Sequence, residues 1–183
     1  LSGEKPYRIV SAPTAERSEE MLFVERESNR IYHGNVSHSE GHASVALGSC
    51  SSVCVILDVA WLPDGSGFVY SRYESNSVIG PGPPESGALY RYDFATGQSR
   101  EIMRFPDEAI GKLSIAPDGE AIVFERGPYF HGDPDTFRWG PRVLCPCQLW
   151  TLDMNSSNLQ MLVEDGRAPA WSPTVPTVSV VGR

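Results

Sequence analysis

The chain has 183 residues, of which 40% are hydrophobic and 21% charged, and its formal net charge is −8 at pH 7. This composition is typical of a folded globular protein, and the acidic balance argues against a nucleic-acid partner and against attraction to anionic membranes. Because no apolar run approaches the roughly 20 residues that cross a bilayer, we expect no membrane-spanning segment. The 17 Gly and 15 Pro residues favour short strands joined by turns over long helices.

A short motif ending in proline recurs four times along the chain. It occupies residues 10–13, 60–63, 114–117 and 170–173, so that successive prolines are 50, 54 and 56 residues apart. Asp-Gly follows the proline in two copies, at residues 64–65 and 118–119. Proline presets φ at the first central position of a turn, and glycine accepts the positive φ that other residues resist. Each copy therefore predicts a turn between two strands.

Three further strands follow each of the first three motifs in the same order, and one follows the fourth. Second strands are predicted at residues 21–24, 68–70, 121–124 and 178–181, third strands at 31–33, 89–93 and 149–153, and fourth strands at 44–47, 101–105 and 159–163. A unit of four short strands cannot bury both of its faces alone, so it must stack on its neighbours. We therefore predict an all-β fold, a single partial β-propeller over 1–183. Its four-stranded antiparallel blades span about 7–50, 53–105 and 110–163, with an incomplete fourth at 168–183.

The repeats at 170–173 (Ala-Trp-Ser-Pro) and 60–65 (Ala-Trp-Leu-Pro-Asp-Gly) resemble the Trp-Ser-Pro-Asp-Gly signature of TolB-type propeller repeats. The first and fourth units depart from it, with Thr-Ala and Thr-Val in place of Asp-Gly. A β-sandwich is the alternative fold, but sandwiches show no such repetition in phase with the strands. Propellers have 4–8 blades, so about three and a half cannot close. We expect a piece of a longer propeller, or a chain whose open edge a protein partner covers.

The resemblance implies a non-catalytic protein-interaction module or a subunit of a larger assembly, periplasmic or otherwise extracytoplasmic. Related propellers cap peptidases of the prolyl-oligopeptidase kind or form polysaccharide lyases, so an accessory propeller domain of an enzyme is the alternative. The sequence contains no nucleophile elbow, phosphate loop or dinucleotide fingerprint. We therefore predict no catalytic residues and no cofactor, and we interpret Asp93 and Asp153, which recur at one position of the repeat, as turn-forming residues.

Two long segments connect second to third strands at the same end of the blades, at about 74–87 and 127–147. Loops of this length are typical of binding surfaces, so we predict that this end binds a protein or a sugar. The alternative is that the second segment folds its own aromatic side chains over the blade. The candidate binding residues are Tyr129, Phe130, His131, Asp133, Asp135, Phe137, Arg138 and Trp139.

Arginines close the predicted second strand of every unit, at Arg26, Arg72, Arg126 and Arg183. A guanidinium group offers a bidentate fork to carboxylate or phosphate, so these residues are candidate anion contacts. The alternative is structural pairing with neighbouring acids, for which Glu25 and Glu125 are adjacent in sequence.

Two groups of side chains have the chemistry of metal ligands. His33, His38 and His42 have irregular spacing, which favours a solvated turn over a zinc site. The cysteines form two close pairs, Cys50 with Cys54 and Cys145 with Cys147, whose spacing is not that of common zinc sites. We predict no metal and at least one disulfide, either Cys50–Cys54 or a bond between the pairs, and hence an oxidising compartment.

Overall fold

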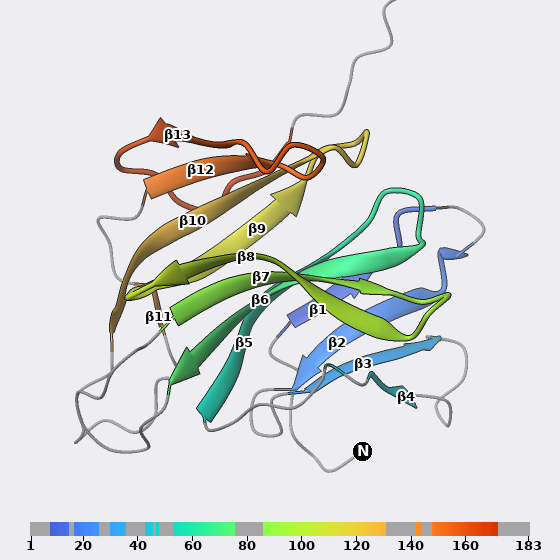
Figure 1. Cartoon of the computed structure of the whole chain (residues 1–183). Coiled ribbons are helices and arrows are strands. Elements are labelled where there is room, and N and C mark those ends of the chain that lie inside the picture. The colour runs from blue at the N-terminus through green and yellow to red at the C-terminus, as the bar shows by residue number, and fades with distance from the viewer. Residues whose placement is uncertain are drawn as a thin grey trace, which may run out of the picture.

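The computed structural model describes residues 8–14, 17–25, 30–35, 43–45, 47, 53–75, 86–130, 142–143 and 148–171. These residues are all-β and form three successive antiparallel sheets, which confirms the predicted four-stranded blades of a partial propeller (Figure 1). The first blade consists of β1 (Arg8–Ser11), β2 (Glu20–Glu25), β3 (Arg30–Asn35) and β4 (Ala43–Ser44). The second consists of β5 (Val53–Trp61), β6 (Gly67–Ser75), β7 (Ser86–Asp93) and β8 (Gln98–Pro106). The third consists of β9 (Glu108–Ile115), β10 (Ala121–Phe130), β12 (Gln148–Asp153) and β13 (Leu159–Val163), with the short β11 (Arg142–Val143) paired to β10.

Within each blade the strands pair in chain order, so each strand runs antiparallel to the one before it. Figure 1 shows the three blades side by side, with the second between the first and the third. The first strand of a blade packs against the preceding blade, as β5 does on β1 and β2 and β9 does on β5, β6 and β7. This is the stacking that a unit with two apolar faces requires.

The Pro-Asp-Gly turns form as the sequence predicts. Gly65 and Gly119 have φ values of 70° and 78°, a region that glycine enters at little cost. The Gly65 amide donates to the carbonyl of Leu62 at 2.9 Å, and the Gly119 amide donates to that of Ala116 at 2.8 Å. These bonds close the turns that join β5 to β6 and β9 to β10.

A second kind of turn, between the third and fourth strands, is built on an aspartate. The Asp93 carboxylate accepts the Thr96 amide at 2.9 Å, and the Asp153 carboxylate accepts the amide of Asn155 at 2.8 Å. Backbone hydrogen bonds, from Thr96 to Asp93 and from Ser156 to Asp153, are the main cause that lowers the pKa of each carboxyl. The interpretation of both residues as turn formers is confirmed.

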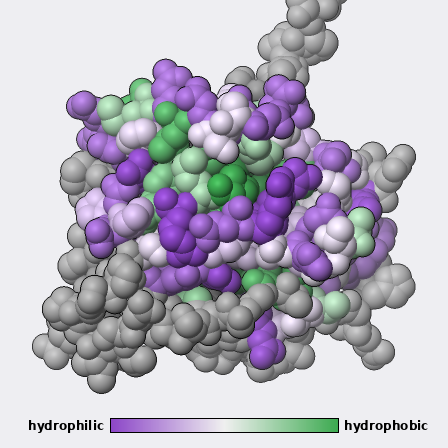
Figure 2. Space-filling model, viewed as in Figure 1, coloured by the Kyte–Doolittle hydropathy of each residue, from purple (hydrophilic) through white to green (hydrophobic). Residues whose placement is uncertain are grey.

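The core consists mainly of two apolar clusters, one at each blade junction. Between the first and second blades it includes Leu22, Val24, Ile31, Val59, Trp61, Phe68, Tyr70 and Tyr90. Between the second and third blades it includes Leu62, Val69, Leu89, Phe105, Ile110, Leu113, Ile122, Phe124 and Leu152. Hydrophobic surface is visible along the second junction, bordered by hydrophilic side chains (Figure 2). Each blade is therefore held chiefly by its neighbours.

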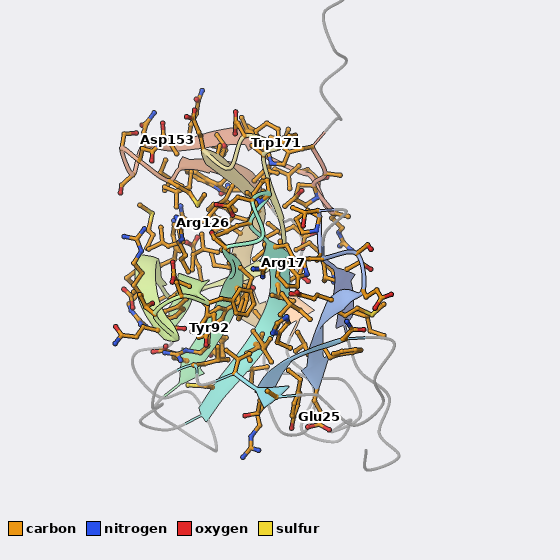
Figure 3. The ribbon with its side chains drawn as sticks, turned by 90° about the vertical axis from the view of Figure 1, so that its right-hand side faces the viewer. Arg17, Glu25, Tyr92, Arg126, Asp153 and Trp171 are labelled. Atoms are coloured by element: carbon orange, nitrogen blue, oxygen red, sulfur yellow. The ribbon has the colours of Figure 1, made fainter. Side chains whose placement is uncertain are left out.

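Two tryptophans each donate their indole N–H to a backbone carbonyl of the blade that precedes them in the chain. Trp61 is 5% exposed and donates its indole N–H to the carbonyl of Val10 at 2.9 Å. Trp171, which is 38% exposed, donates to the carbonyl of Ser114 at 3.2 Å and lies against the third blade (Figure 3). Val10 and Ser114 occupy the same position of the repeat, three residues before the proline.

Candidate functional site

The strands that lead into the two long segments extend further than the sequence suggested. β6 reaches Ser75, and β10 continues through Tyr129 and Phe130, which pair with β11. The prediction that the loop begins at about residue 127 is therefore wrong. Pro128 forms the last pair of the ladder between β10 and β9, beyond the residues of β10 that pair with β12, so its missing N–H does not interrupt the sheet.

Most of the predicted binding residues lie outside the described part of the chain. This holds for His131, Asp133, Asp135, Phe137, Arg138 and Trp139, for the side chains of Tyr129 and Phe130, and for residues 76–85. Their role as a binding surface stays a prediction. The structure does describe the strand ends from which both segments depart, and these ends carry two clusters of charged and aromatic side chains.

The first cluster lies on the second blade, where β6 leads into the segment 76–85. Arg72 and Arg104 both donate to the hydroxyl oxygen of Tyr90, at 2.9 and 2.7 Å, and that hydroxyl donates to Glu74 at 2.7 Å. Glu74 also accepts from Arg72 at 2.7 Å and from Arg104 at 2.9 Å. Three neighbouring strands, β6, β7 and β8, are thus tied to one carboxylate. The cluster fixes the end of β6.

The protonation states of this cluster follow from its contacts. Burial alone would raise the pKa of Glu74, but hydrogen bonds from Arg104, Tyr90 and Arg72 outweigh it and lower that pKa to about 2. Burial, and the bond that its hydroxyl donates to Glu74, raise the pKa of Tyr90. At neutral pH the carboxylate is therefore charged and the phenol protonated. In these protonation states the hydrogen bonds of the cluster are all maintained, so the three strands are held together at neutral pH.

The second cluster is centred on Arg126, which lies between the second and third blades (Figure 3). Its guanidinium group lies over the rings of Phe105 and Trp150, 4.7 and 4.5 Å from their centres, and its Nε donates to Glu108. A guanidinium between two aromatic faces gains cation–π attraction from both. The cluster joins β8, β9, β10 and β12 just before β10 leads into the second long segment.

Both described arginines of the proposed anion set are therefore ion-paired within the chain. Arg72 pairs with Glu74, and Arg126 pairs with Glu108 rather than with the adjacent Glu125 that the sequence had suggested. Glu125 instead accepts backbone amides, from Lys112 at 3.2 Å and from Ala168 at 2.5 Å. Arg26 and Arg183 lie outside the described residues, so an anion contact at the four positions stays a prediction.

His33, the one histidine of the predicted set that the structure describes, belongs to a blade junction. Its Nε2 lies 2.9 Å from a carboxylate oxygen of Glu20, and its ring packs against Phe94 and Trp61, with ring centres 4.6 and 5.8 Å apart. His38 and His42 lie outside the described residues. Among those that are described, no three His, Cys, Asp or Glu side chains are placed to share a metal ion.

Cys54, near the start of β5, is the one cysteine within the described ranges. It is disulfide-bonded, and the other three cysteines of the chain lie outside those ranges. Whether Cys54 pairs with Cys50 or with a cysteine of the third blade therefore stays a prediction.

A buried carboxylate that the sequence analysis did not single out lies deeper in β5. Asp58 is 0% exposed and sits at a bulge between β5 and β6. It accepts the Leu113 amide of β9 at 3.0 Å, and the Lys112 ammonium lies 3.8 Å from its other oxygen. The second and third blades are thus joined by a charge-assisted bond. A lone aspartate in an otherwise apolar strand was the signal for it.

No family model matches the chain, and no curated protein matches it. Solved structures do resemble it, including structures of propeller type. An oligogalacturonate lyase in complex with manganese matches with a TM-score of 0.56 and 17% identity, over 85% of this chain and 35% of its own length. Kuenenia stuttgartiensis hydrazine synthase matches with a TM-score of 0.59 and 15% identity, over 88% of this chain and 43% of its own length. Porphyromonas gingivalis dipeptidyl peptidase 4 matches with a TM-score of 0.53 and 10% identity, over 84% of this chain and 25% of its own length.

At these identities the likeness shows the fold alone. The chain spans less than half the length of each of these three structures. Within the described residues no helix has the length and apolarity needed to cross a membrane.

Proposed function

We propose that this chain is part of a non-catalytic TolB-type β-propeller that binds another protein, as an interaction module or as a subunit of a larger assembly. The observation that carries the proposal is the anchoring of the two strands, β6 and β10, that lead into the long segments. Ion pairs centred on Glu74 and Arg126 tie these strands to their neighbours. Binding residues on loops work best when a rigid scaffold positions them.

A second region for polypeptide contact is the outer edge of the third blade, at β13. Met161, Leu162 and Val163 of this strand are exposed, and so is Trp171, which follows it in the chain. The Trp171 bond to Ser114 repeats the Trp61 bond to Val10, so it supports a further blade stacked here as the second blade stacks on the first. We propose that the open edge beyond that blade is covered by the partner.

The disulfide at Cys54 supports an extracytoplasmic location, periplasmic or secreted, because such bonds persist in oxidising compartments. No nucleic acid, metal or cofactor enters the proposed function. The net charge of −8 disfavours a nucleic-acid partner.

Crosslinking mass spectrometry on the protein in its native source tests the proposed function. The expected result is a set of crosslinks from a partner protein to residues 74–87 and 127–147. Replacing Trp139 by Ala in that source should reduce the crosslinks, while the turn variant Asp153→Asn serves as a control with an unchanged binding end. Crosslinks confined to other surfaces would contradict the proposal.

An accessory propeller domain of an enzyme is the second candidate function. It is favoured by the similar solved structures, among them a lyase and a dipeptidyl peptidase. The two functions differ in the polypeptide that carries the repeats. An accessory domain requires a catalytic segment in the same polypeptide, which the intact mass of the native protein and its activity on peptide or oligogalacturonate substrates would reveal. A native polypeptide that consists of propeller repeats alone would exclude this candidate.

A further inference from the structure

At the end of the blades opposite to the long segments, a recess lies between the Pro-Asp-Gly turns of the second and third blades. Its volume is about 330 Å³, and Leu62, Pro63 and Pro117 form its apolar wall. Asp64, Asp118 and Arg91 supply the charged groups, and Gly119 completes the lining. Pockets of this size and mixed character are able to hold one side chain or a small ligand.

The repeat offers an internal comparison for this recess. At the junction of the first and second blades, Gly65 has the place that Gly119 has at the next junction, because each follows the turn proline by two residues. There the side chain of Arg17 covers the glycine: its Cδ lies 3.3 Å from the point where a Cβ on Gly65 would be. An arginine of this chain therefore occupies the first of the two equivalent positions.

The second position lacks that arginine. The Ala12 amide bonds to the carbonyl of Glu20 across the first turn, whereas the Leu62 amide bonds to that of Gly67 across the second, so the first turn is three residues longer. The shorter turn, residues 63–66, contains no arginine or lysine. The nearest atom to a Cβ on Gly119 is Cδ of Pro63, at 3.5 Å. At this junction the turn of the second blade therefore places a proline beside the glycine, where the first junction has an arginine.

The charges of the recess favour a cation. Asp64 and Asp118 each use Oδ1 to accept a turn amide, from Ser66 and Glu120 respectively, both at 2.9 Å. Within the described ranges neither Oδ2 has a hydrogen-bond donor, and Arg91 has no ion pair with either carboxylate. The bonds from Ser66 are the main cause that lowers the pKa of Asp64, with a smaller contribution from Arg91. Two carboxylates and one guanidinium leave the lining with an excess negative charge at neutral pH.

We propose that this recess binds an arginine side chain of a protein partner. The stem lies along Leu62, Pro63 and Pro117, as the Arg17 stem lies over Gly65, and the guanidinium group points toward the free oxygens of Asp64 and Asp118. Long cationic side chains suit such a site because their methylene groups cover apolar surface while the head meets carboxylates. The inference rests on the proposed protein-binding function and adds a chemical preference at a separate end of the blades.

A titration of the full chain, labelled with ¹⁵N, by N-acetyl-arginine methylamide tests the proposal. The expected result is saturable chemical-shift change at the amides of Gly119 and Ser66. The norleucine and glutamate analogues should produce smaller chemical-shift changes. Asp118→Asn should weaken binding of the arginine probe about two- to fivefold, as expected for an exposed ion pair. Glu25→Gln, at the end of β2 in the first blade and at the opposite end of the blades from the recess, should leave binding unchanged.

The variant Arg91→Gln tests whether the recess prefers a positively or a negatively charged ligand. Removing this positive charge should strengthen binding of the arginine probe about twofold, because like charges repel across the recess. Preference for the glutamate probe, or weaker arginine binding in Arg91→Gln, would overturn the proposal in favour of an anion. No saturable shift with any probe would overturn it as well. Partner crosslinks at residues 127–147 together with an unresponsive recess would refute this inference alone and leave the proposed function standing.

Discussion

Trp61 of the second blade reaches the backbone of the first, where its indole N–H donates to the carbonyl oxygen of Val10 at 2.9 Å. The same ring packs against His33 of the first blade and Phe94 of its own. One side chain therefore combines the apolar core of a blade junction with a directional bond. Its contribution can be separated into these two parts by mutation.

Trp61→Phe keeps an aromatic ring but removes the donor, so the free energy of unfolding should fall by about 1 kcal/mol. Trp61→Ala also empties the junction and should cost about 3–5 kcal/mol. Urea denaturation followed by circular dichroism measures both. Trp171→Phe is the matched control, because the more exposed Trp171 should lose less than about 0.5 kcal/mol. Equal losses at the two positions would contradict the role assigned to Trp61.

The Glu74 cluster predicts a pH dependence of stability. The pKa of Glu74 is lowered from 4.5 to about 2, so its ionised form stabilises the fold above pH 4.5, and this contribution is lost as the pH falls from 4.5 toward 2. Glu74→Gln should cost about 2 kcal/mol at pH 7, and the difference from the unmodified chain should shrink through that window. Denaturation at a series of pH values measures this.

Glu101→Gln is the control for Glu74, because Glu101 also pairs with Arg104 but has a 40% exposed side chain. Its loss of stability should be below about 1 kcal/mol at pH 7. A constant difference between Glu74→Gln and the unmodified chain from pH 7 to pH 2 would show that the low pKa is wrong.

Gly67 and Gly97 distinguish steric from conformational reasons for glycine. A Cβ on Gly67 would lie 2.0 Å from the carbonyl oxygen of Tyr92, which is backbone and cannot move aside. Gly67→Ala should therefore cost more than about 3 kcal/mol. Gly97 has φ +66°, and a Cβ there would make only an ordinary contact, 3.8 Å from the Tyr92 hydroxyl, so Gly97→Ala should cost only about 1 kcal/mol. Thermal denaturation orders the two variants, and the reverse order would contradict the register of β6 and β7.

The cysteines predict the oxidation state of the native protein. Mass spectrometry under non-reducing conditions should recover Cys54 in a disulfide-linked peptide and identify its partner. We expect Cys50 first and a cysteine of the third blade, Cys145 or Cys147, as the alternative. Four free thiols in protein from its native source would remove the main support for an extracytoplasmic location.

The repeating elements of the fold could be predicted from the sequence, because each depends on local chemistry that recurs in phase. The Pro-Asp-Gly turns and the aspartate turns at Asp93 and Asp153 are of this kind. Strand ends were harder to predict. Gly127 and Pro128 resemble a break, but the pairing of Pro128 with Glu108 depends on where β9 begins, and no local pattern encodes that.

The charged contacts were the least predictable part of the candidate site. Arg126 pairs with Glu108, from the strand before it, rather than with the adjacent Glu125, because neighbouring residues of a strand point to opposite faces of the sheet. Arg72 follows the same rule, since its partner Glu74 lies two residues away and therefore on the same face. Period-two alternation would have identified the pair of Arg72 with Glu74 but not the pair of Arg126 with Glu108.

The tryptophan bonds also bear on how such a chain can change in length. Ile115 occupies the position of Trp61 and Trp171 in the third blade, and the junction it faces is bridged by Asp58 and the Leu113 amide instead. In the described part of the chain, the bonds of Trp61 and Trp171 are thus of one kind and the bond between the second and third blades is of another. Removing the second blade would place Ile115, which has no donor, where Trp61 stood, and would remove Asp58 and its bond to the Leu113 amide. Loss of a single blade should therefore destabilise the new junction as well as shorten the repeat.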